Sequence, residues 1–409
     1  MKILLVCQCF YPETFRVNDI CKELVARGHE VTVLAGHPIN RTTGRFWEGY
    51  GKGKRCEDTY EGARVVRAYN SERHDDPIHL IFHYFSFWFF GNRKAAKLAK
   101  EEKYDAVFVY QLSPVFMAFP GIKVAKKQNI PMVIYTLDLW PDSAVNAGGM
   151  NFGPVVKWLQ GRVNKIYNAA SKILVSSSEF KNKIVAMGHD ENKIELYRQY
   201  CEDSYKKLER NPEDPIEKEL PDGFRIIFTG NIGTSQGIEH VVDAAAVIKE
   251  KGGFDDIKWI IVGDGRNMEA VQQRAKEKNV TDRVIFTGRK PMEDMSRYLA
   301  ASDVALMILR EDPLFDITLP AKIQSYMACG MPILGCVKGE TARVIKEANC
   351  GVVSNAISGN ALAEAALSMY NMSKDELAKM GENANAYSKA HFDRKKLMDR
   401  LEEVLGEVQ

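Results

Sequence analysis

The chain has 409 residues, of which 45% are hydrophobic and 27% are charged. This length and composition predict a globular protein of two domains, each with enough apolar residues for its own core. The formal net charge is only +2, so the composition gives no electrostatic case for nucleic-acid binding. No stretch reaches the ~20 apolar residues that a transmembrane helix needs. Met1–Val6 is expected to be a short strand rather than part of a signal peptide.

Apolar runs alternate with helical patterns through the first half of the chain. Residues 17–25 have apolar side chains at helical spacing, and Gly28 is expected to end that helix. The expected strands are Lys2–Cys7, Val31–Ala35, Gly62–Tyr69, Ala106–Tyr110, Met132–Tyr135 and Ile173–Ser176, and the further expected helices are Phe82–Leu98, Ile122–Gln128 and Glu179–Met187.

Residues 202–222 are charged and contain prolines, which is typical of a linker, and the alternation restarts after them. The expected strands are Arg225–Thr229, Trp259–Val262, Val284–Thr287, Val304–Ile308 and Ile333–Gly335; the expected helices are Ile238–Lys249, Met268–Lys278, Met292–Ala300, Lys322–Cys329, Ala361–Met372 and Arg394–Leu405.

Two successive series of this kind predict an α/β protein with two doubly wound parallel sheets. We assign residues 1–202 to a first domain and 203–381 to a second, and expect the helical stretch 382–409 to pack back onto the first. Ligands of such sheets lie outside the carboxyl ends of the strands, so the loops that follow strands are the candidate binding segments.

The most informative loop lies within REDPLFDITLPAKIQSYMACG, residues 310–330. Pro320 suits the first turn of a helix, where free backbone N–H groups form an anion site. Lys322 lies in that turn, and a lysine there is unfavourable for the helix dipole unless an anion is nearby. The stretch therefore indicates a diphosphate ligand; a solvated lysine is the alternative.

Two glycine-bearing turns also follow expected strands. The stretch FTGNIGTSQGI has glycines at 230, 233 and 237, which allow close approach of the backbone to a ligand, and its Asn231 and Gln236 can hydrogen-bond phosphate or sugar. Gly263-Asp264-Gly265 can present backbone groups to a base or ribose. Plain tight turns explain both stretches equally well.

In the first half, polar and aromatic residues follow two strands. Asp138, Trp140 and Asp142 suit a sugar, because carboxylates accept hydroxyl hydrogen bonds and an indole stacks on a sugar face; a capped turn with Trp140 as an anchor is the alternative. Glu13 and Arg16 are candidate acceptor contacts, unless their segment is a plain surface loop.

The aromatic segment IHLIFHYFSFWFF, residues 78–90, is followed by three basic residues, Arg93, Lys94 and Lys97. An amphipathic patch that rests on anionic lipid is one interpretation. A helix buried in the core is the other.

The eight cysteines are scattered and form no Cys-x-x-Cys pair. They are interpreted as buried thiols of a reducing compartment, which predicts a cytoplasmic protein. No His-x-Glu-x-His or Asp-x-Asp pattern occurs at an expected strand end, so neither a metal nor any other cofactor is predicted.

Several motifs together, in this order and spacing, resemble glycosyltransferase family four, which has the GT-B fold. They are MKILLVCQCFYPE, ARGHEVTVLAGHP, GNIGTSQGI, IVGDGR, VIFTGRKPMEDMSRYLAASDVALMIL and LPAKIQSYMACGMPIL. The LDLWPDS turn, Gln199, Gln236 and the Leu-Pro-Ala-Lys stretch are similar to the branch found in bacterial capsule, O-antigen and exopolysaccharide assembly, including fucosamine-type transferases.

The resemblance implies two Rossmann-like domains facing a central cleft, and a metal-independent hexosyl- or N-acetylhexosaminyltransferase that retains the anomeric configuration. The implied donor is a nucleotide sugar, with uridine as the favoured base, on the second domain. The implied acceptor is a lipid-linked saccharide on the first, at the inner face of the cell membrane. Expected catalytic residues are Asp138, Lys322 and Glu340; expected acceptor contacts are Glu13, Arg16 and Trp140; expected donor contacts are Gly230, Asn231, Gly233, Gln236, Gly263, Asp264, Gly265, Arg289, Arg310, Thr318, Leu319, Pro320, Lys322 and Ser325.

This sequence departs from the wider family at two places. Asn231 and Gln236 stand where Arg and Lys are common, which shifts the charge for a leaving diphosphate onto Lys322, with Arg289 or Arg310 as further candidates. Ile317 and Ser325 stand where two glutamates are common, which leaves the sugar-contacting carboxylate open between Asp316, Glu340 and none.

The competing functions are a nucleotide-sugar epimerase or a phosphorylase of the same fold, and a catalytically weak partner of another transferase. A dehydrogenase is disfavoured because the first βα turn, QCFYPETFR, has no G-x-G-x-x-G.

Overall fold

The computed structural model describes residues 1–40, 43–74, 76–148 and 153–408. The chain forms two compact units, one of Met1–Tyr197 with Met398–Gln409 and the other of Arg198–Leu397. Both are α/β units, as the alternating pattern predicted. The second unit begins before the expected boundary at residue 202, and much of the stretch 382–409 belongs to it.

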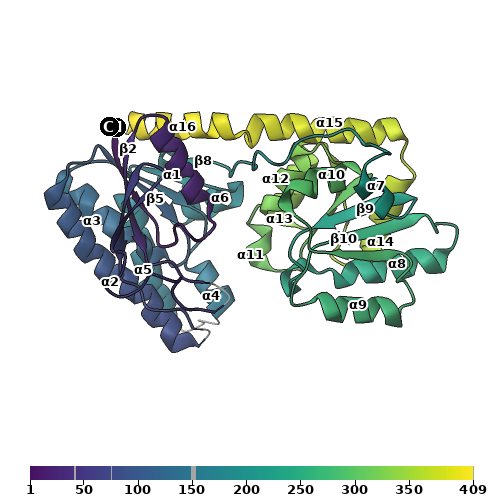
Figure 1. Ribbon diagram of the computed structural model, residues 1–409, viewed down its shortest axis with the longest axis horizontal. Helices are drawn as coiled ribbons and strands as arrows, with labels where there is room; N and C mark the ends of the chain where they lie inside the picture. Colours follow the sequence, from purple (N-terminus) through teal and green to yellow (C-terminus); the bar gives the residue numbers. More distant parts are fainter. Residues whose placement is uncertain (41–42, 75, 149–152, 409) are drawn as a thin grey trace. The chain divides into compact units, whose positions relative to one another are not determined.

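The first unit is built on an eight-stranded sheet, in the order β3-β4-β2-β1-β5-β6-β7-β8. All neighbouring strands are parallel except β3 and β4. The strands are β1 Lys2–Val6, β2 Glu30–Gly36, β3 Glu57–Tyr60, β4 Ala63–Ala68, β5 Ala106–Gln111, β6 Met132–Thr136, β7 Lys172–Val175 and β8 Ile194–Leu196; the helices are α1 Arg16–Ala26, α2 Pro77–Glu101, α3 Phe119–Gln128, α4 Asp142–Gly148, α5 Gly153–Ala169 and α6 Ser178–Ala186. In Figure 1, α2 and α3 lie side by side on one side of this sheet and α1 lies on the other.

The local sequence explains these elements. In α1 the residues at helical spacing, including Val17, Ile20 and Leu24, are buried. Helix α2 begins before the expected residue 82, because the Asp76 side chain accepts a hydrogen bond from the N–H of His79 and Pro77 occupies the first turn.

The second unit has a six-stranded parallel sheet, in the order β11-β10-β9-β12-β13-β14. This is the strand order of a Rossmann fold, which reverses direction between its first and fourth strands, here β9 and β12. The strands are β9 Phe224–Thr229, β10 Ile257–Val262, β11 Val284–Gly288, β12 Val304–Ile308, β13 Ile333–Cys336 and β14 Gly351–Val353; the helices are α7 Pro215–Glu219, α8 Glu239–Lys251, α9 Met268–Glu277, α10 Met295–Ala300, α11 Pro313–Asp316, α12 Ala321–Ala328, α13 Gly339–Glu347, α14 Gly359–Tyr370, α15 Lys374–His391 and the start of α16 Arg394–Glu407.

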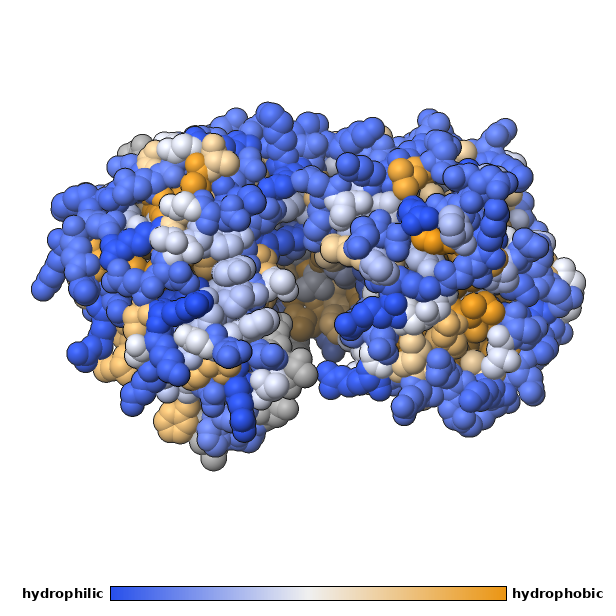
Figure 2. Space-filling view, viewed as in Figure 1, coloured by the Kyte–Doolittle hydropathy of each residue, from blue (hydrophilic) through white to orange (hydrophobic). Residues whose placement is uncertain are grey.

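Alternate residues of the second sheet enter two separate cores. On β9, Ile227 packs with α10 and α12, whereas Ile226 and Phe228 pack with α8, α9 and α14. Figure 1 shows these two sets of helices on opposite sides of the sheet. The outer face drawn in Figure 2 is mostly hydrophilic in each unit, with only small orange areas, because the apolar strands are covered in this way.

The expected linker is part of the second unit. It contains α7, and Glu217 of this helix accepts hydrogen bonds from Arg210 at 2.7 Å and from the buried Arg225 at 2.7 Å. Asp214 pairs with Arg297 at 2.6 Å. These ion pairs fix the segment against the second sheet, so it is not a free tether.

Candidate functional site

The loops after β9, β10 and β11 are joined by main-chain hydrogen bonds. The N–H of Gly230 donates to the carbonyl of Val262 at 2.9 Å, and the N–H of Gly263 donates to the carbonyl of Gly288 at 2.9 Å. A Cβ on Gly263 would lie 1.8 Å from the carbonyl oxygen of Gly230, and the φ of Gly263 is +146°. Only glycine fits there, so two predicted donor loops touch through their backbones.

The rest of the glycine loop is held by the segments after β10 and β12. The N–H of Ile232 donates to the carbonyl of Asp264 at 2.9 Å, and the N–H of Arg310 donates to the carbonyl of Ser235 at 3.0 Å. Since β9 and β12 are neighbours at the reversal of strand order, these loops lie where such sheets bind their ligands.

Lys322 of α12 reaches into this group of loops. Its ammonium donates to the side-chain oxygen of Gln236 and lies 4.3 Å from the ring centroid of Phe228. It would lie 3.3 Å from a Cβ on Gly230. No carboxylate forms an ion pair with it among the residues described, and burial lowers its pKa to about 7. A cation without a counter-ion, beside exposed backbone, favours an anionic ligand.

The segments before α12 and α13 meet at the same end of the sheet. The hydroxyl of Thr341 donates to the carbonyl of Thr318 at 3.3 Å. Gly339, with φ +59°, passes so close to Asp316 that a Cβ would lie 1.9 Å from its carbonyl oxygen. The partly exposed Leu319 and Pro320 therefore lead into α12 beside the start of α13. The N-terminus of a helix is favourable for an anion.

The side chain of Glu340 lies inside the second unit rather than on its surface. It is 0% exposed and accepts two hydrogen bonds from Arg343, the shorter of 2.8 Å. The guanidinium of the buried Arg198 lies 3.8 Å from the carboxylate of Glu340. Its catalytic role stays a prediction. Asp316, the other candidate carboxylate, is partly exposed, and burial raises its pKa.

The remaining predicted donor residues differ in exposure. Asn231, Arg289 and Arg310 are exposed at the ends of β9, β11 and β12, whereas Gly233 is buried. Ser325 is 6% exposed, and its hydroxyl donates to the carbonyl of Ala321 at 3.4 Å, so its donor role stays a prediction.

Sequence reasoning missed Tyr326. Its fully buried hydroxyl accepts a hydrogen bond from the N–H of Thr229 at 2.9 Å, at the residue before Gly230. Tyr326 thus positions the start of the glycine loop. Its place on the buried face of α12 was the only signal in the sequence.

In the first unit, Asp138 follows β6 and is held by its neighbours. It accepts hydrogen bonds from the hydroxyls of Ser113 and Ser143. The indole N–H of Trp140 donates to Ser113 at 2.9 Å. A carboxylate with these donors is oriented, and its roles in catalysis and acceptor binding stay predictions.

The expectation that Trp140 stacks on a sugar requires correction. The side chain is 3% exposed and packs edge-on against Phe116, with ring centroids 5.8 Å apart. It also packs against Tyr84 at 6.2 Å. These aromatic neighbours leave no open face for a sugar, so the ring is an internal anchor of its turn.

Glu13 and Arg16 lie at the carboxyl end of β1, next to the reversal of strand order between β1 and β5. Glu13 is 8% exposed and lines a small cavity of about 30 Å³ with Gln8, His37 and His83. Arg16 is half-buried at the start of α1. The predicted acceptor residues Glu13, Arg16 and Trp140 thus all follow strands at the carboxyl end of the first sheet, and Trp140 differs in that its ring packs against other aromatic rings.

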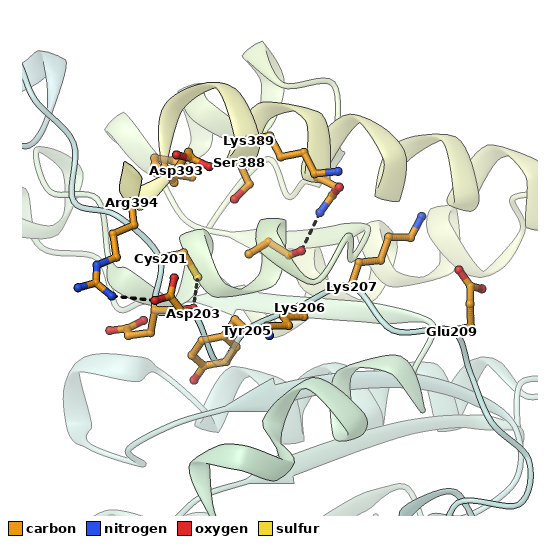
Figure 3. A pocket seen from close by; sticks show the side chains of 14 residues that line it. Cys201, Asp203, Tyr205, Lys206, Lys207, Glu209, Ser388, Lys389, Asp393 and Arg394 are labelled. Carbon is orange, nitrogen blue, oxygen red and sulfur yellow. Dashed lines mark hydrogen bonds and ion pairs between the residues drawn. The ribbon is translucent and has the colours of Figure 1, made fainter. Parts of the chain in front are cut away.

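A large cavity lies elsewhere in the second unit. It has a volume of about 670 Å³ and lies between the segment 201–209 and the 385–394 region of the second unit. Figure 3 shows its side chains, with Asp203 paired to Arg394 at 2.7 Å. None of the predicted site residues lines it, so volume alone does not identify the site.

Two further searches concern the described part of the chain. No helix there combines the length and apolarity that crossing a bilayer requires. No three His, Cys, Asp or Glu side chains there are grouped so that they could bind a metal ion. All eight cysteines are free, and six of them are buried.

Comparison with known proteins matches both units to sugar-transferring enzymes. A family described as "Glycosyltransferase Family 4" matches residues 15–197, and one described as "Glycosyl transferases group 1" matches residues 223–372. A probable glycosyltransferase, WbjE of Pseudomonas aeruginosa, is 29% identical over 58% of this chain and 58% of its own length. The putative colanic acid biosynthesis glycosyl transferase WcaI of Escherichia coli is 23% identical over 81% of this chain and 82% of its own.

The chain spans little more than half the length of the first of these relatives, and 45% of an N-acetyl-alpha-D-glucosaminyl L-malate synthase from Bacillus anthracis. Among solved structures, HepE of Anabaena in complex with UDP superposes with a TM-score of 0.72 at 16% identity, over all of both chains. Sucrose-phosphate synthase of Thermosynechococcus elongatus gives 0.74 at 15% identity, over 99% of this chain and 98% of that one. These likenesses show the GT-B fold.

Proposed function

For a chain that belongs to the glycosyltransferases, with a family four domain followed by a group 1 domain, we propose a transferase that moves a sugar from a nucleotide-sugar donor to a lipid-linked glycan in bacterial surface polysaccharide synthesis. The observation that carries the proposal is Lys322, a half-buried cation without an ion pair among the described residues, set against the glycine loop after β9. UDP or UDP-glucose is bound in three structures of HepE, which has this fold.

The donor's diphosphate would lie over residues 230–237 and the start of α12. Its base would lie near residues 263–266 and Arg289. As the bond from the anomeric carbon to the diphosphate oxygen breaks, negative charge develops on the leaving group. Lys322 and the backbone N–H groups around it would stabilise that charge, and by analogy with oxyanion holes one such donor contributes roughly 3–4 kcal/mol. The positive charge thus comes from the protein, in keeping with metal-independent transfer.

The acceptor would bind at the carboxyl ends of the first sheet's strands, near Glu13, Arg16 and Asp138. For retention without a covalent intermediate, its hydroxyl attacks from the face that the diphosphate leaves. The proton of that hydroxyl passes to the departing diphosphate, so that no separate base is needed. Asp138, oriented by Ser113 and Ser143, would hold acceptor hydroxyls during this step.

The exposed side of α2 supports a peripheral contact with the inner face of the membrane. Ile81, Phe82 and Phe89 are 49%, 64% and 57% exposed, while Phe87 and Leu98 on the same helix are buried. Each of the two interpretations of the sequence therefore describes one face of the helix. One face packs into the core, and the other presents apolar side chains next to basic ones. Such a surface binds the headgroup region of anionic bilayers.

The polysaccharide setting rests on the relatives. The name of WcaI refers to colanic acid biosynthesis, and the name of a further relative, AmsK of Erwinia amylovora, refers to amylovoran biosynthesis. An extracellular polysaccharide built on a lipid carrier would give this chain a lipid-linked acceptor.

The test is a melting-temperature screen against UDP, GDP, ADP and TDP, followed by transfer assays with the sugars of whichever nucleotide binds. A nucleotide at 100 times its dissociation constant stabilises the fold by about 2.7 kcal/mol. Mass spectrometry then detects the extended acceptor, and NMR of the new linkage reports its anomeric configuration. A protein that binds no nucleotide would be a partner subunit, and one that changes the sugar without an acceptor would be an epimerase.

A further inference from the structure

A second cavity, in the first unit, lies at the carboxyl ends of β2 and β4. It has a volume of about 310 Å³ and is lined by His37 after β2, Arg67 at the end of β4, Lys52, and Arg93, Lys94 and Lys97 of α2. Five of its lining residues are thus cationic, and none is acidic. We call this cavity the basic pocket.

Arg67 is a buried cation in the wall of the basic pocket. Its side chain is 1% exposed, and it donates to the carbonyls of Gly36 at 3.1 Å and Tyr11 at 2.8 Å. Its Nε atom is buried without a hydrogen-bond partner, and no carboxylate forms an ion pair with it in the described part of the chain. A buried charge without a counter-ion is costly. An anion in the pocket would relieve that cost.

His37 forms another part of the wall and is also incompletely bonded. It is 2% exposed, and its Nδ1 atom is buried without a partner. Its backbone is fixed by Asn70, which accepts from the N–H of His37 at 2.5 Å and donates to its carbonyl at 3.1 Å. Burial, with the charges of Arg67 and Lys94, lowers its pKa to about 4. A neutral imidazole can donate one N–H to an anion without adding charge.

Few carboxylates pair with the cationic side chains of α2 that line the basic pocket. Lys97 pairs with Glu101 of its own helix at 3.4 Å, whereas Arg93 and Lys94 have no carboxylate partner among the residues described; the guanidinium of Arg93 lies 5.7 Å from the centroid of the Phe89 ring. The pKa of Glu57 is lowered by its hydrogen bond to Arg64, at 2.9 Å, and to a smaller extent by the charges of Lys97 and Lys94. The pocket therefore has excess positive charge, which suits a phosphate group.

The basic pocket borders the predicted acceptor site. His37 lines both this pocket and the small cavity that contains Glu13. Phe90 also lines the pocket and is 38% exposed on the side of α2 that carries Phe82 and Phe89. A ligand seated here would thus meet polar acceptor residues on one side and exposed aromatic residues on the other.

We infer that the basic pocket binds the phosphate or diphosphate group of an anionic acceptor, between its saccharide and its apolar chain. This inference rests on the proposed function for the identity of the acceptor. The phosphate chemistry itself rests only on the cations, the two unpartnered nitrogen atoms and the volume.

The binding test uses the full chain and inorganic pyrophosphate, followed by calorimetry. Saturating UDP keeps pyrophosphate out of the second unit wherever UDP binds. The double variant Arg93→Ala/Lys94→Ala removes two cations of the pocket, and Lys100→Ala removes an exposed lysine of the same helix that does not line it. We expect pyrophosphate affinity to fall at least tenfold in the double variant and to stay unchanged in Lys100→Ala, with equal melting temperatures for both. Equal affinities in the two proteins would overturn the inference.

The source of the phosphate is tested by transfer to two acceptors that carry the same glycan, one diphosphate-linked and one without phosphate. We expect the double variant to raise KM at least tenfold for the first and to leave KM for the second unchanged. If pyrophosphate binding is lost while both KM values stay at the wild-type level, the pocket takes free phosphate, and the acceptor assignment is wrong. If the wild type transfers no sugar at all but still binds pyrophosphate here, the proposed function fails and the phosphate site stands.

Discussion

The substitution Lys322→Met tests two effects of the Lys322 charge: its cost to folding stability, and its contribution to donor binding and catalysis. Methionine keeps an unbranched side chain of similar length over Phe228 and removes the charge. Burial lowers the pKa of Lys322 from 10.5 to about 7. At 1.36 kcal/mol per pKa unit, that difference corresponds to roughly 4–5 kcal/mol against the charged form in the folded protein. The free energy of unfolding should therefore be higher in the variant than in the wild type at pH 6.5.

The pH dependence has a defined sign. Between pH 7 and 10.5 the unfolded wild type still binds the Lys322 proton and the folded protein does not, so wild-type stability rises with pH over this range. The variant lacks this gain, and its advantage should shrink steadily toward pH 10. Urea denaturation at pH 6.5, 8 and 9.5 measures both proteins, with Lys276→Met, an exposed lysine of α9, as the matched control.

Function should move in the opposite direction. Without the ammonium, kcat should fall by about 100- to 1,000-fold, the loss found when one oxyanion-hole donor is removed. UDP affinity of the wild type should decrease between pH 7.5 and 9.5, because Lys322 must be protonated to bind the diphosphate, and the variant should show no such decrease. A variant that is less stable than the wild type at pH 6.5, yet binds UDP and turns over normally, would refute the placement of the diphosphate at Lys322.

Three further substitutions test the geometry around the site. Tyr326→Phe leaves the buried N–H of Thr229 without its partner, so the free energy of unfolding should fall by about 1–3 kcal/mol and the donor KM should rise; an unchanged melting temperature would contradict this. Gly263→Ala forces a Cβ onto the carbonyl of Gly230 and should abolish UDP binding in calorimetry, whereas Gly161→Ala, with no neighbour within 4 Å on α5, should raise stability by about 0.4–1 kcal/mol. Glu340→Gln weakens the contact with Arg343 and should lower the free energy of unfolding, measured by urea denaturation, by about 1.5–3 kcal/mol. If the carboxylate also contacts the sugar, kcat per folded molecule should fall as well; if it does not, kcat per folded molecule should stay unchanged.

Most strands and helices were predictable because their signals are local. The apolar runs of β1 and β9 and the spacing in α1 each lie within a dozen residues, and the structure confirms them. The elements that were missed include α5 and α13, whose buried residues recur at helical spacing, and elements with weak apolar patterns. Helix α15 is one example: it is marked in the sequence only by its capping box, in which Ser373 and Glu376 bond each other's backbone N–H.

The sequence by itself determined the two α/β series, the loops that can meet a ligand and the lysine at the start of α12, because periodicity, glycine and proline positions and strand order act over short stretches. Only the tertiary structure decided which side chains are enclosed. It buried Trp140 against Phe116, placed Tyr326 under Thr229 and collected the cations of the basic pocket from β4, α2 and the loops around them. Burial and charge pairing depend on residues far apart along the chain, such as the 97 positions between Thr229 and Tyr326, so no local pattern records them.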